Sequence, residues 1–259
     1  MNSKTFQTHV DHVLNGDRPC AIMHGDCLKH GFVLPAESVD LVLVDPPYGM
    51  KYRGLEDRQK PILNDERPFV WWLHHAYRVG KDPSAIACFT QWRYQQDFRR
   101  FIEVAGYAIR SHVIWDRMRH GMGAPHCTFA PMHDVIWFAT KGRYRFPGGR
   151  PNSILHAANV PVSQRFHTTQ KPDELMRDLV RSLTPAGGVV CDFTMGSGST
   201  GVAAIELGCR FIGFEQDDEN FAIAKRRLDD AVARREQSGR VKGCAVRPMH
   251  YSEVRRAVA

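Results

Sequence analysis

Residues 188–201, GVVCDFTMGSGSTG, hold a short apolar run, an aspartate and a turn with three glycines. The run Gly188 to Asp192 predicts a buried strand, and Thr200 to Leu207 predicts the helix that follows the turn. Glycines permit a tight strand-to-helix turn and let the backbone approach a ligand closely. The stretch therefore predicts an α/β fold whose ligand lies where a strand ends.

An acidic residue completes the motif that the glycines begin. Gly196, Gly198 and Gly201 have the spacing Gly-x-Gly-x-x-Gly, and Glu215 closes the next apolar run, which starts at Phe211. This combination indicates an adenosine-containing cofactor, because the acid accepts hydrogen bonds from ribose hydroxyls. No lysine follows the glycines, so a phosphate-cradling loop is less well supported. NAD and S-adenosylmethionine both remain open on this motif alone.

Apolar runs alternate with amphipathic stretches along the rest of the chain, which predicts a parallel sheet covered by helices. Strands are expected at Cys20–His24, Val39–Val44, Ala85–Thr90, Ala108–Trp115 and Val135–Thr140. Helices are expected at 66–79, 93–104, 171–183 and from Asp218 onward, with Pro172 in the first turn of the third. Residues 141–168 lack periodicity and are expected to form an irregular insertion.

The composition is that of an ordinary globular protein, with 43% hydrophobic and 24% charged residues. There is no run of about eighteen apolar residues and no apolar leader at the N-terminus, so we expect a cytoplasmic protein without a membrane span. The seven cysteines form no Cys-x-x-Cys pair, which favours free thiols over disulfides or zinc. We expect no metal site, because His74 and His75 are adjacent on a helix and do not share a face.

The positive charge is concentrated in two segments. Residues 110–150 carry seven Lys and Arg against two acids, and residues 225–259 carry ten against four, within a net charge of +7. The remainder of the chain is therefore acidic. Two basic segments on an acidic body suit a polyanionic partner. For the C-terminal segment, a solvated charged helix explains the pattern equally well.

A second motif, Asp45-Pro46-Pro47-Tyr48, directly follows the strand expected at Val39–Val44. The prolines lack N–H donors and keep the backbone extended, so the carbonyl of Pro46 is a rigid acceptor beside the carboxylate of Asp45. Tyr48 adds an aromatic face. Two acceptors and a ring fit a planar base that carries an exocyclic NH₂ group. The alternative is a proline-rich loop in which Asp45 merely caps a turn.

These acceptors have a chemical use. The lone pair of an amino nitrogen on a base is delocalised into the ring, and accepting both N–H hydrogens frees it to attack a methylsulfonium carbon in line. A charge-assisted hydrogen bond contributes about 1.5–3 kcal/mol, whereas orienting two bound reactants contributes about 7–11 kcal/mol. The motif therefore favours S-adenosylmethionine over NAD, with positioning as the larger share of catalysis.

Five segments together resemble the β-type DNA amino-methyltransferases, in which the catalytic loop precedes the cofactor loop. The matching segments are His24–Leu28, Asp45–Tyr48, His167–Pro172, Met195–Gly201 and Phe211–Glu215. The resemblance covers most of the chain. It implies a Rossmann-like S-adenosylmethionine-dependent methyltransferase sheet with a circularly permuted motif order. The implied parts are a catalytic half at 1–116, a target-recognition insertion at 117–166 with a returning strand near 134–140, a cofactor-binding half at 167–235, and a basic tail at 236–259.

The resemblance also implies roles for individual residues. The implied catalytic residues are Asp45, Pro46, Pro47 and Tyr48. The implied cofactor-binding residues are Asp26, Cys27, Asp45, His167, Thr169, Gln170, Lys171, Asp192, Phe193, Thr194, Met195, Gly196, Ser197, Gly198, Thr200, Glu215 and Gln216. Two positions depart from the family pattern. Thr194 stands in place of an aromatic residue, which implies looser cofactor packing, and Thr168 stands in place of a proline, which implies a less rigid loop.

The implied substrate is double-stranded DNA. The residues expected to contact it are Arg117, Arg119, His120, Arg143, Arg145, Arg150 and Arg165. A base inside a duplex cannot reach the cofactor, so the target must be flipped out and stacked on Tyr48. Adenine N6 is favoured as the target because the loop begins with Asp, where the cytosine-N4 members of the family more often carry Ser. A restriction-modification setting in a prokaryote or phage is expected, and a homodimer is a candidate assembly.

Other function classes fit less well. A cytosine-C5 enzyme needs a Pro-Cys nucleophile, but Pro19-Cys20 precedes its strand. A protein-glutamine methyltransferase has Asn-Pro-Pro-Tyr after its cofactor loop, and a dehydrogenase leaves the Asp45 motif unexplained. A cytosine-N4 enzyme and a DNA-binding homologue without catalysis remain as alternatives. The recognition sequence cannot be read from the chain.

Overall fold

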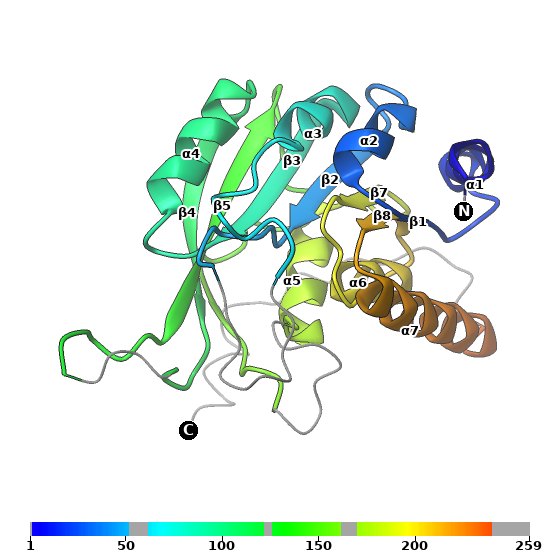
Figure 1. The fold of residues 1–259 in the computed structure, drawn as a ribbon. Coiled ribbons are helices and arrows are strands. Elements are labelled where there is room, and N and C mark those ends of the chain that lie inside the picture. Colours follow the sequence, from blue (N-terminus) through cyan, green and yellow to red (C-terminus); the bar gives the residue numbers. More distant parts are fainter. Residues whose placement is uncertain (1, 52–61, 122–125, 162–169, 240–259) are drawn as a thin grey trace.

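The computed structural model describes residues 2–51, 62–121, 126–161 and 170–239, and its strands form one eight-stranded sheet of order β1-β8-β7-β2-β3-β5-β4-β6 (Figure 1). The strands are β1 (Cys20–His24), β2 (Val39–Val44), β3 (Gly80–Thr90), β4 (Ala108–Asp116), β5 (His133–Lys141), β6 (Ile154–His156), β7 (Val189–Asp192) and β8 (Arg210–Glu215). The helices are α1 (Ser3–Asn15), α2 (Cys27–His30), the short 3-10 helix η1 (Gly31–Val33), α3 (Leu73–Val79), α4 (Gln95–Val104), α5 (Asp173–Leu183), α6 (Ser199–Glu206) and α7 (Asp218–Gln237). The expected α/β class is confirmed.

All strands of the sheet run in one direction except β5, which is antiparallel to both of its neighbours, β3 and β4. The ends of β1, β8, β7, β2 and β3 therefore meet at one edge of the sheet, which we call the carboxyl edge, and the opposite edge is the amino edge. β7 and β8 come late in the chain but lie between β1 and β2. This insertion of late strands into the middle of the sheet confirms the permuted order.

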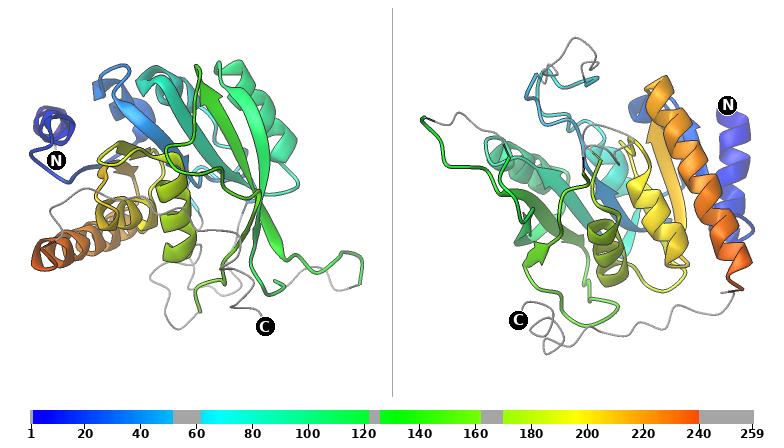
Figure 2. Two further views of the ribbon diagram at one scale, coloured as in Figure 1. Left: turned by 180° about the vertical axis from the view of Figure 1, so that it is seen from behind. Right: turned by 90° about the horizontal axis from the view of Figure 1, so that it is seen from below.

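Helices cover both faces of the sheet, as the views in Figures 1 and 2 show. The apolar sides of α1, α3 and α4 belong to one core, and those of α5, α6 and α7 belong to the other. Strand β2 explains the division, because Val42 and Val44 point into the first core while Leu41 and Leu43 point into the second. A central strand that is apolar on both sides is typical of a parallel sheet buried between two helical layers.

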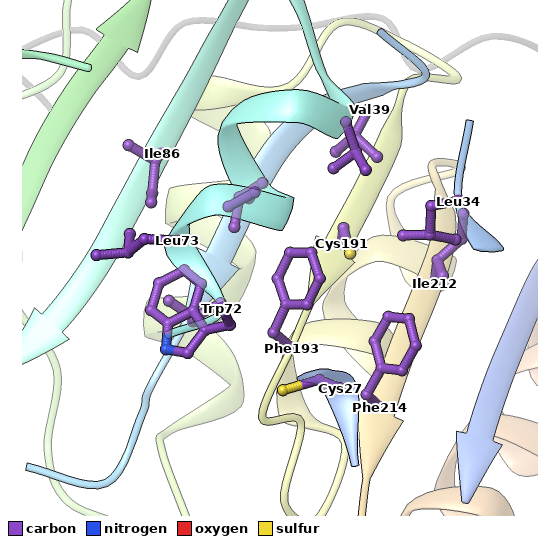
Figure 3. Close-up of a cluster of buried hydrophobic side chains, with 14 of the residues drawn as sticks. Cys27, Leu34, Val39, Trp72, Leu73, Ile86, Cys191, Phe193, Ile212 and Phe214 are labelled. Atoms are coloured by element: carbon purple, nitrogen blue, oxygen red, sulfur yellow. The ribbon is translucent and has the colours of Figure 1, made fainter. Parts of the chain in front are cut away.

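Aromatic rings fill the first core next to the glycine-rich turn (Figure 3). The Phe193 ring stacks on Phe214, with 5.5 Å between centroids and 1° between planes, and on Trp72 at 5.8 Å. Phe6 of α1 meets Phe214 edge-on at 5.4 Å. The ring of Phe193, a residue that is only 2% exposed, therefore anchors the glycine-rich turn to the core.

Three expectations differ from the structure. The helix expected at 66–79 begins only at Leu73, because Phe69 instead donates its N–H to the carbonyl of Pro47 at 3.1 Å. Pro172 is the N-cap of α5 and lies before its first turn, with an extended ψ of 133°. The insertion expected to be irregular at 141–168 contains the short strand β6, which pairs with β4.

The N-terminal helix α1 was not among the expected elements. Its apolar residues Phe6, Val10 and Val13 recur at helical spacing and are all buried. Asn2 caps its start by accepting the N–H of Thr5 at 2.9 Å. None of the helices in the described part of the chain has the length and apolar character that crossing a bilayer requires.

Asp40 provides a test of how the central strands are joined at the amino edge. Its carboxylate accepts the ammonium of Lys81 at 2.8 Å and the N–H of Val189 at 2.8 Å, which links β2 to β3 and β7. Asp40→Ala leaves these donors without their acceptor. We expect its free energy of unfolding in urea to fall by about 2 kcal/mol.

The control is Asp229→Ala, which removes an ion pair with Lys225 whose two side chains are 61% and 62% exposed. Exposed pairs of this kind contribute under about 0.5 kcal/mol. Equal losses of stability in the two variants would contradict the linking role of Asp40.

Candidate active site

Acidic side chains gather along the carboxyl edge. Asp26 follows β1, Asp45 follows β2, Asp192 ends β7 and Glu215 ends β8. These strands are consecutive neighbours in the sheet, in the order β1-β8-β7-β2. The expectation that the polar motifs lie where strands end is confirmed, and motifs that are far apart in the sequence meet at one edge.

The glycine-rich turn is folded around two of these carboxylates. Gly196 and Gly198 have φ values of 52° and 81°, which residues with a side chain rarely adopt. Asp192 accepts the N–H of Thr194 at 3.0 Å and the hydroxyl of Thr200 at 2.7 Å. Glu215 accepts the N–H of Gly196 at 2.8 Å and the N–H of Asp217 at 2.8 Å. A carboxylate has about four acceptor positions, so Glu215 retains capacity for a ligand hydroxyl.

Thr194 carries an unusual hydroxyl. Its Oγ1 is buried, and no donor or acceptor in the described part of the chain bonds to it. A buried polar atom without a partner costs about 1–3 kcal/mol. Thr194 lies between Asp192 and Gly196 in the chain, so its hydroxyl is a candidate contact for a ligand held by this turn. The position at which this sequence departs from the family therefore offers a polar contact in place of an aromatic one.

The edge is electrostatically suited to a cation. Burial, together with the charges of Asp45 and Glu215, raises the pKa of Asp192 to about 7. Burial also raises the pKa of Glu215. Neighbouring carboxylates with raised pKa values repel anions and are stabilised by a positive charge. A sulfonium or an ammonium group at this edge would favour the ionised form of these carboxylates.

Asp45 is held by two donors. Its carboxylate accepts the ammonium of Lys171 and the hydroxyl of Tyr48. The Lys171 side chain is 10% exposed, and its Nζ lies 5.0 Å from the ring centroid of Phe89. Burial, together with the charge of Asp45, raises the pKa of Tyr48 well above its ordinary value, so its hydroxyl remains a donor. The sequence prediction assigned Lys171 to the cofactor, and the structure brings it to the catalytic carboxylate.

The loop after Asp45 is fixed at Gly49. Asp65, which is buried, accepts the N–H of Gly49 at 2.7 Å, and Tyr94 donates its hydroxyl to the carbonyl of Gly49 at 3.0 Å. Gly49 has a φ of 90°, and a Cβ there would lie 2.5 Å from the backbone of Arg67. By contrast, the carbonyl of Pro46 receives no hydrogen bond from any described residue. That carbonyl is thus available as the second acceptor that the motif predicted.

Arg227 of α7 is a site residue that sequence reasoning missed. Its guanidinium donates to the carbonyl of Ser197 at 2.7 Å, to the hydroxyl of Ser199 at 3.1 Å and to the carboxylate of Asp173 at 2.8 Å. Asp173 follows Lys171 by two residues. Arg227 therefore joins the glycine turn to the segment that carries Lys171. In the sequence it is one basic residue in a charged helix, with no signal of this role.

The remaining predicted cofactor residues lie close to these. Asp26 caps α2 by accepting the N–H of Leu28 at 2.9 Å, and Cys27 is buried, which raises the pKa of its thiol. Met195 is buried in the core, and Gln170 and Gln216 directly precede Lys171 and follow Glu215. His167 and Thr169 lie outside the described residues. The described ranges hold no group of three or more His, Cys, Asp or Glu side chains arranged for a metal ion.

The arginines predicted to contact DNA are not brought together. Arg117 bonds within its own hairpin, to the carbonyl of Pro131 at 2.9 Å. Arg119 and His120 are exposed on the segment that leaves β4 at the carboxyl edge and projects from the body (Figure 1).

Other members of this set lie elsewhere. Arg143 and Arg145 follow the end of β5, which is at the amino edge because β5 is antiparallel. Arg150 lines a cavity of about 400 Å³ between α5 and β3, β4 and β5. Arg165 lies outside the described residues. The role of this set in binding DNA stays a prediction.

Comparison with known proteins adds to this geometry. Residues 39–226 match the model of a family described as DNA methylase. The DNA adenine methyltransferase YhdJ of Escherichia coli (strain K12) is 27% identical over 259 residues, covering 83% of this chain and 85% of that protein.

Two solved structures share the fold. The crystal structure of the M1.HpyAVI–SAM complex has a TM-score of 0.65 at 22% identity and covers 81% of this chain and 99% of that one. The PvuII DNA methyltransferase, which is cytosine-N4-specific, has a TM-score of 0.66 at 17% identity and covers 84% and 92%.

Replacing Arg227 tests its link to the glycine turn. In Arg227→Met the Ser197 carbonyl and the Asp173 carboxylate lose a buried donor, so we expect stability to fall by about 2–4 kcal/mol. We also expect faster hydrogen exchange of the amides at 195–200, measured by mass spectrometry, with partial recovery in Arg227→Lys.

The matched control is Arg210→Met, because Arg210 also donates to carbonyl groups, among them Gly187 at 2.9 Å and Leu14 at 2.6 Å, but at the amino edge. This variant should lose stability without faster exchange at 195–200. The same exchange pattern in both variants would argue that Arg227 has only a general structural role.

The raised pKa of Asp192 predicts a pH-dependent stability. The folded carboxyl titrates near 7 and the unfolded one near its ordinary 3.8, so the folded state binds the proton more tightly. Its contribution is fully present below about pH 4 and is lost as pH rises through 7, by up to about 1.4 kcal/mol per pH unit.

We therefore expect the stability of the protein relative to Asp192→Asn to decline between pH 5 and 7 and to level off above pH 8. Urea unfolding of both proteins across this range measures the difference. A constant difference would show that Asp192 ionises normally.

Proposed function

The chain belongs to the DNA methylases, the family of N6 and N4 DNA methyltransferases, and we propose that it transfers a methyl group from S-adenosylmethionine to the N6 amino group of adenine in double-stranded DNA. The observation that carries the proposal is Asp45. Its carboxylate lies at the carboxyl edge and is bonded by two donors, and the carbonyl of the next residue, Pro46, accepts no hydrogen bond from the described residues. These are the acceptors that an exocyclic amino group requires.

The charge of the edge supports the choice of methyl donor. S-adenosylmethionine, when bound, supplies a methyl group on a positively charged sulfur. Asp26, Asp45, Asp192 and Glu215 place carboxyl groups along this edge, and burial, with the charges of Asp45 and Glu215, raises the pKa of Asp192. The hydroxyl of Thr194 and the remaining acceptor capacity of Glu215 offer polar contacts to the donor. A dinucleotide would bring its pyrophosphate into the same repulsive field.

The amino group of the target base must replace one donor on Asp45. Tyr48 and Lys171 occupy the carboxylate in this structure, one on each oxygen. As the base enters, its N–H groups bond Asp45 and the Pro46 carbonyl, and the amino nitrogen is oriented with its lone pair toward the methyl group. The Tyr48 ring then stacks on the base. Because a paired base cannot reach this edge, the reaction requires that the base leaves the duplex.

Lys171 holds Asp45 ready for the base. A carboxylate that is 24% exposed costs free energy if its charge is unpaired, and the ammonium of Lys171 provides that pairing before substrate arrives. During transfer, positive charge develops on the amino nitrogen. The bond from this nitrogen to Asp45 then strengthens, which stabilises the transition state more than the bound substrate.

We propose adenine as the target because of the first residue of the loop, which is an aspartate. The resemblance associates Asp at this position with adenine more often than with cytosine, and the relative YhdJ is named a DNA adenine methyltransferase. Cytosine N4 is the second candidate, because both amino groups present two N–H donors on a planar ring. A long-read sequence of DNA from cells that express the protein distinguishes the two, since it reports modified base and site together.

The catalytic assignment is tested with Asp45→Asn and Asp45→Ala. We expect both variants still to bind S-adenosylmethionine by calorimetry, and to lose at least a hundredfold in methyl transfer when the donor is saturating. Transfer is measured with tritiated S-adenosylmethionine on unmethylated bacterial genomic DNA made by polymerase chain reaction.

Asp40→Asn, at the amino edge of the same strand, is the control and should keep its transfer rate. An Asp45→Ala variant with full activity would sink the mechanism. Failure of the unaltered protein to bind the donor at millimolar concentration would sink the proposed cofactor.

A further inference from the structure

Two tryptophans on the surface stand out from the other three. Trp72, Trp115 and Trp137 are buried, whereas Trp71 and Trp92 are 50% and 53% exposed. Tryptophan has the largest apolar surface of any side chain, so exposure of half a ring leaves much apolar area in water. The segments that carry both exposed rings contact the loop that follows Asp45.

The segment of Trp71 packs directly against the catalytic loop. Asp65 accepts the N–H of Gly49, and Phe69 donates its N–H to the carbonyl of Pro47 at 3.1 Å. The backbone between them is so close to the loop that a Cβ on Gly49 would lie 2.5 Å from the carbonyl carbon of Arg67. Trp71 follows Phe69 by two residues, and the next residue, Trp72, is buried against Phe193. Its position beside the loop is therefore fixed.

Trp92 lies on a second segment that contacts the same loop. β3 ends at Thr90, and Cys88 of β3 pairs with Val44 of β2, so the residues after Thr90 continue at the level of the loop. Tyr94 donates its hydroxyl to the carbonyl of Gly49 at 3.0 Å, two residues beyond Trp92. Gly49 is thus held between the two segments that carry the exposed tryptophans.

Each exposed ring has its own arginine. The Cζ of Arg67 lies 5.5 Å from the ring centroid of Trp71, and the Cζ of Arg93 lies 5.4 Å from that of Trp92. Both arginines are exposed. A guanidinium that lies over an indole presents a flat cation on which a base can stack and whose N–H groups can bond a phosphate. The pairing of an aromatic face with a cation matches the pairing of base and phosphate in a nucleotide.

We propose, building on the function above, that Trp71–Arg67 and Trp92–Arg93 form a DNA-contact surface that brackets the catalytic loop and holds the nucleotides adjacent to the target base. This surface lies outside 117–166, where the sequence placed the DNA contacts. Its two segments bond Gly49 of the loop that follows Asp45 at the carboxyl edge, whereas Arg143 and Arg145 lie at the amino edge. Bases next to a flipped nucleotide lose a stacking neighbour, and an indole can replace it.

The first test measures DNA binding without catalysis. The probe is a fluorescein-labelled 30-base-pair duplex of random sequence, followed by anisotropy at fixed salt. We expect Trp71→Ala and Trp92→Ala each to weaken binding by about 5- to 100-fold, with partial recovery in the Phe variants, which retain a stacking face. Affinity for S-adenosylmethionine should stay unchanged.

The control is Phe32→Ala, which removes a residue that is 65% exposed in η1, beside Leu34, whose carbonyl accepts Arg78 at 2.8 Å. It tests whether loss of any exposed aromatic residue lowers affinity. We expect no change in DNA binding. Arg67→Gln and Arg93→Gln should reduce the dependence of binding on salt concentration, because each loses one phosphate contact.

The second test compares the KM for DNA with the KM for S-adenosylmethionine, with unmethylated genomic DNA as the substrate. Loss of the contact surface should raise KM for DNA by the same factor as the binding loss and leave KM for S-adenosylmethionine unaltered. Affinities within twofold of the original protein for both Ala variants would overturn the proposal. A change in oligomeric mass by light scattering with DNA affinity unchanged would also overturn it, because the surface would then bind a second copy.

Failure of this inference can be told apart from failure of the proposed function. If the unaltered protein transfers no methyl group to DNA, the proposed function is wrong. The anisotropy measurement then still tests whether the surface binds DNA, because it requires no methyl transfer. If the unaltered protein is active and the tryptophan variants bind and react normally, only the surface is wrong.

Discussion

The site depends on the carboxylate of Asp45 and the two donors that hold it. Tyr48 belongs to the same loop, whereas Lys171 lies just before α5, much later in the chain. A largely buried charge is costly when unpaired, and the rings of Phe89 and Trp115 surround the Lys171 ammonium at 5.0 and 6.0 Å. The pair therefore fixes the loop after β2 relative to the segment that leads into α5, and in the proposed function that relation determines where a base enters.

Arg227 extends the same constraint behind the site. It neutralises none of the four carboxylates at the edge. Instead it donates to Ser197 of the glycine turn and to Asp173 at the start of α5. Lys171 lies two residues before Asp173. The carboxyl groups at the edge, among them the buried Asp192 with its raised pKa of about 7, therefore stay available to a ligand. In the proposed function, Arg227 supports the loops from behind while these carboxyl groups face the methyl donor.

Rigidity of the catalytic loop and contact with DNA share the same segments. Asp65 and Tyr94 fix Gly49 from two sides. The segment that holds Asp65 also holds the exposed Trp71, and the segment that holds Tyr94 also holds the exposed Trp92. If those rings contact DNA, the distance from the contacts to Asp45 is set by the hydrogen bonds that hold the loop. Precise placement of a base then follows from one set of interactions, which suits a reaction in which orientation contributes most.

The sequence by itself determined the α/β class, the two motifs and the order in which they occur, because strand periodicity, glycine spacing and proline restrictions are local properties. It also placed Asp45, Asp192 and Glu215 at strand ends. Only the tertiary structure decided that Lys171 meets Asp45, that Arg227 and Asp65 support the loops, and that Arg143 and Arg145 lie at the amino edge. These relations depend on the strand order β8-β7-β2-β3-β5 and on the antiparallel direction of β5. Strand order and direction are set by packing between distant segments, which leaves no local pattern to read.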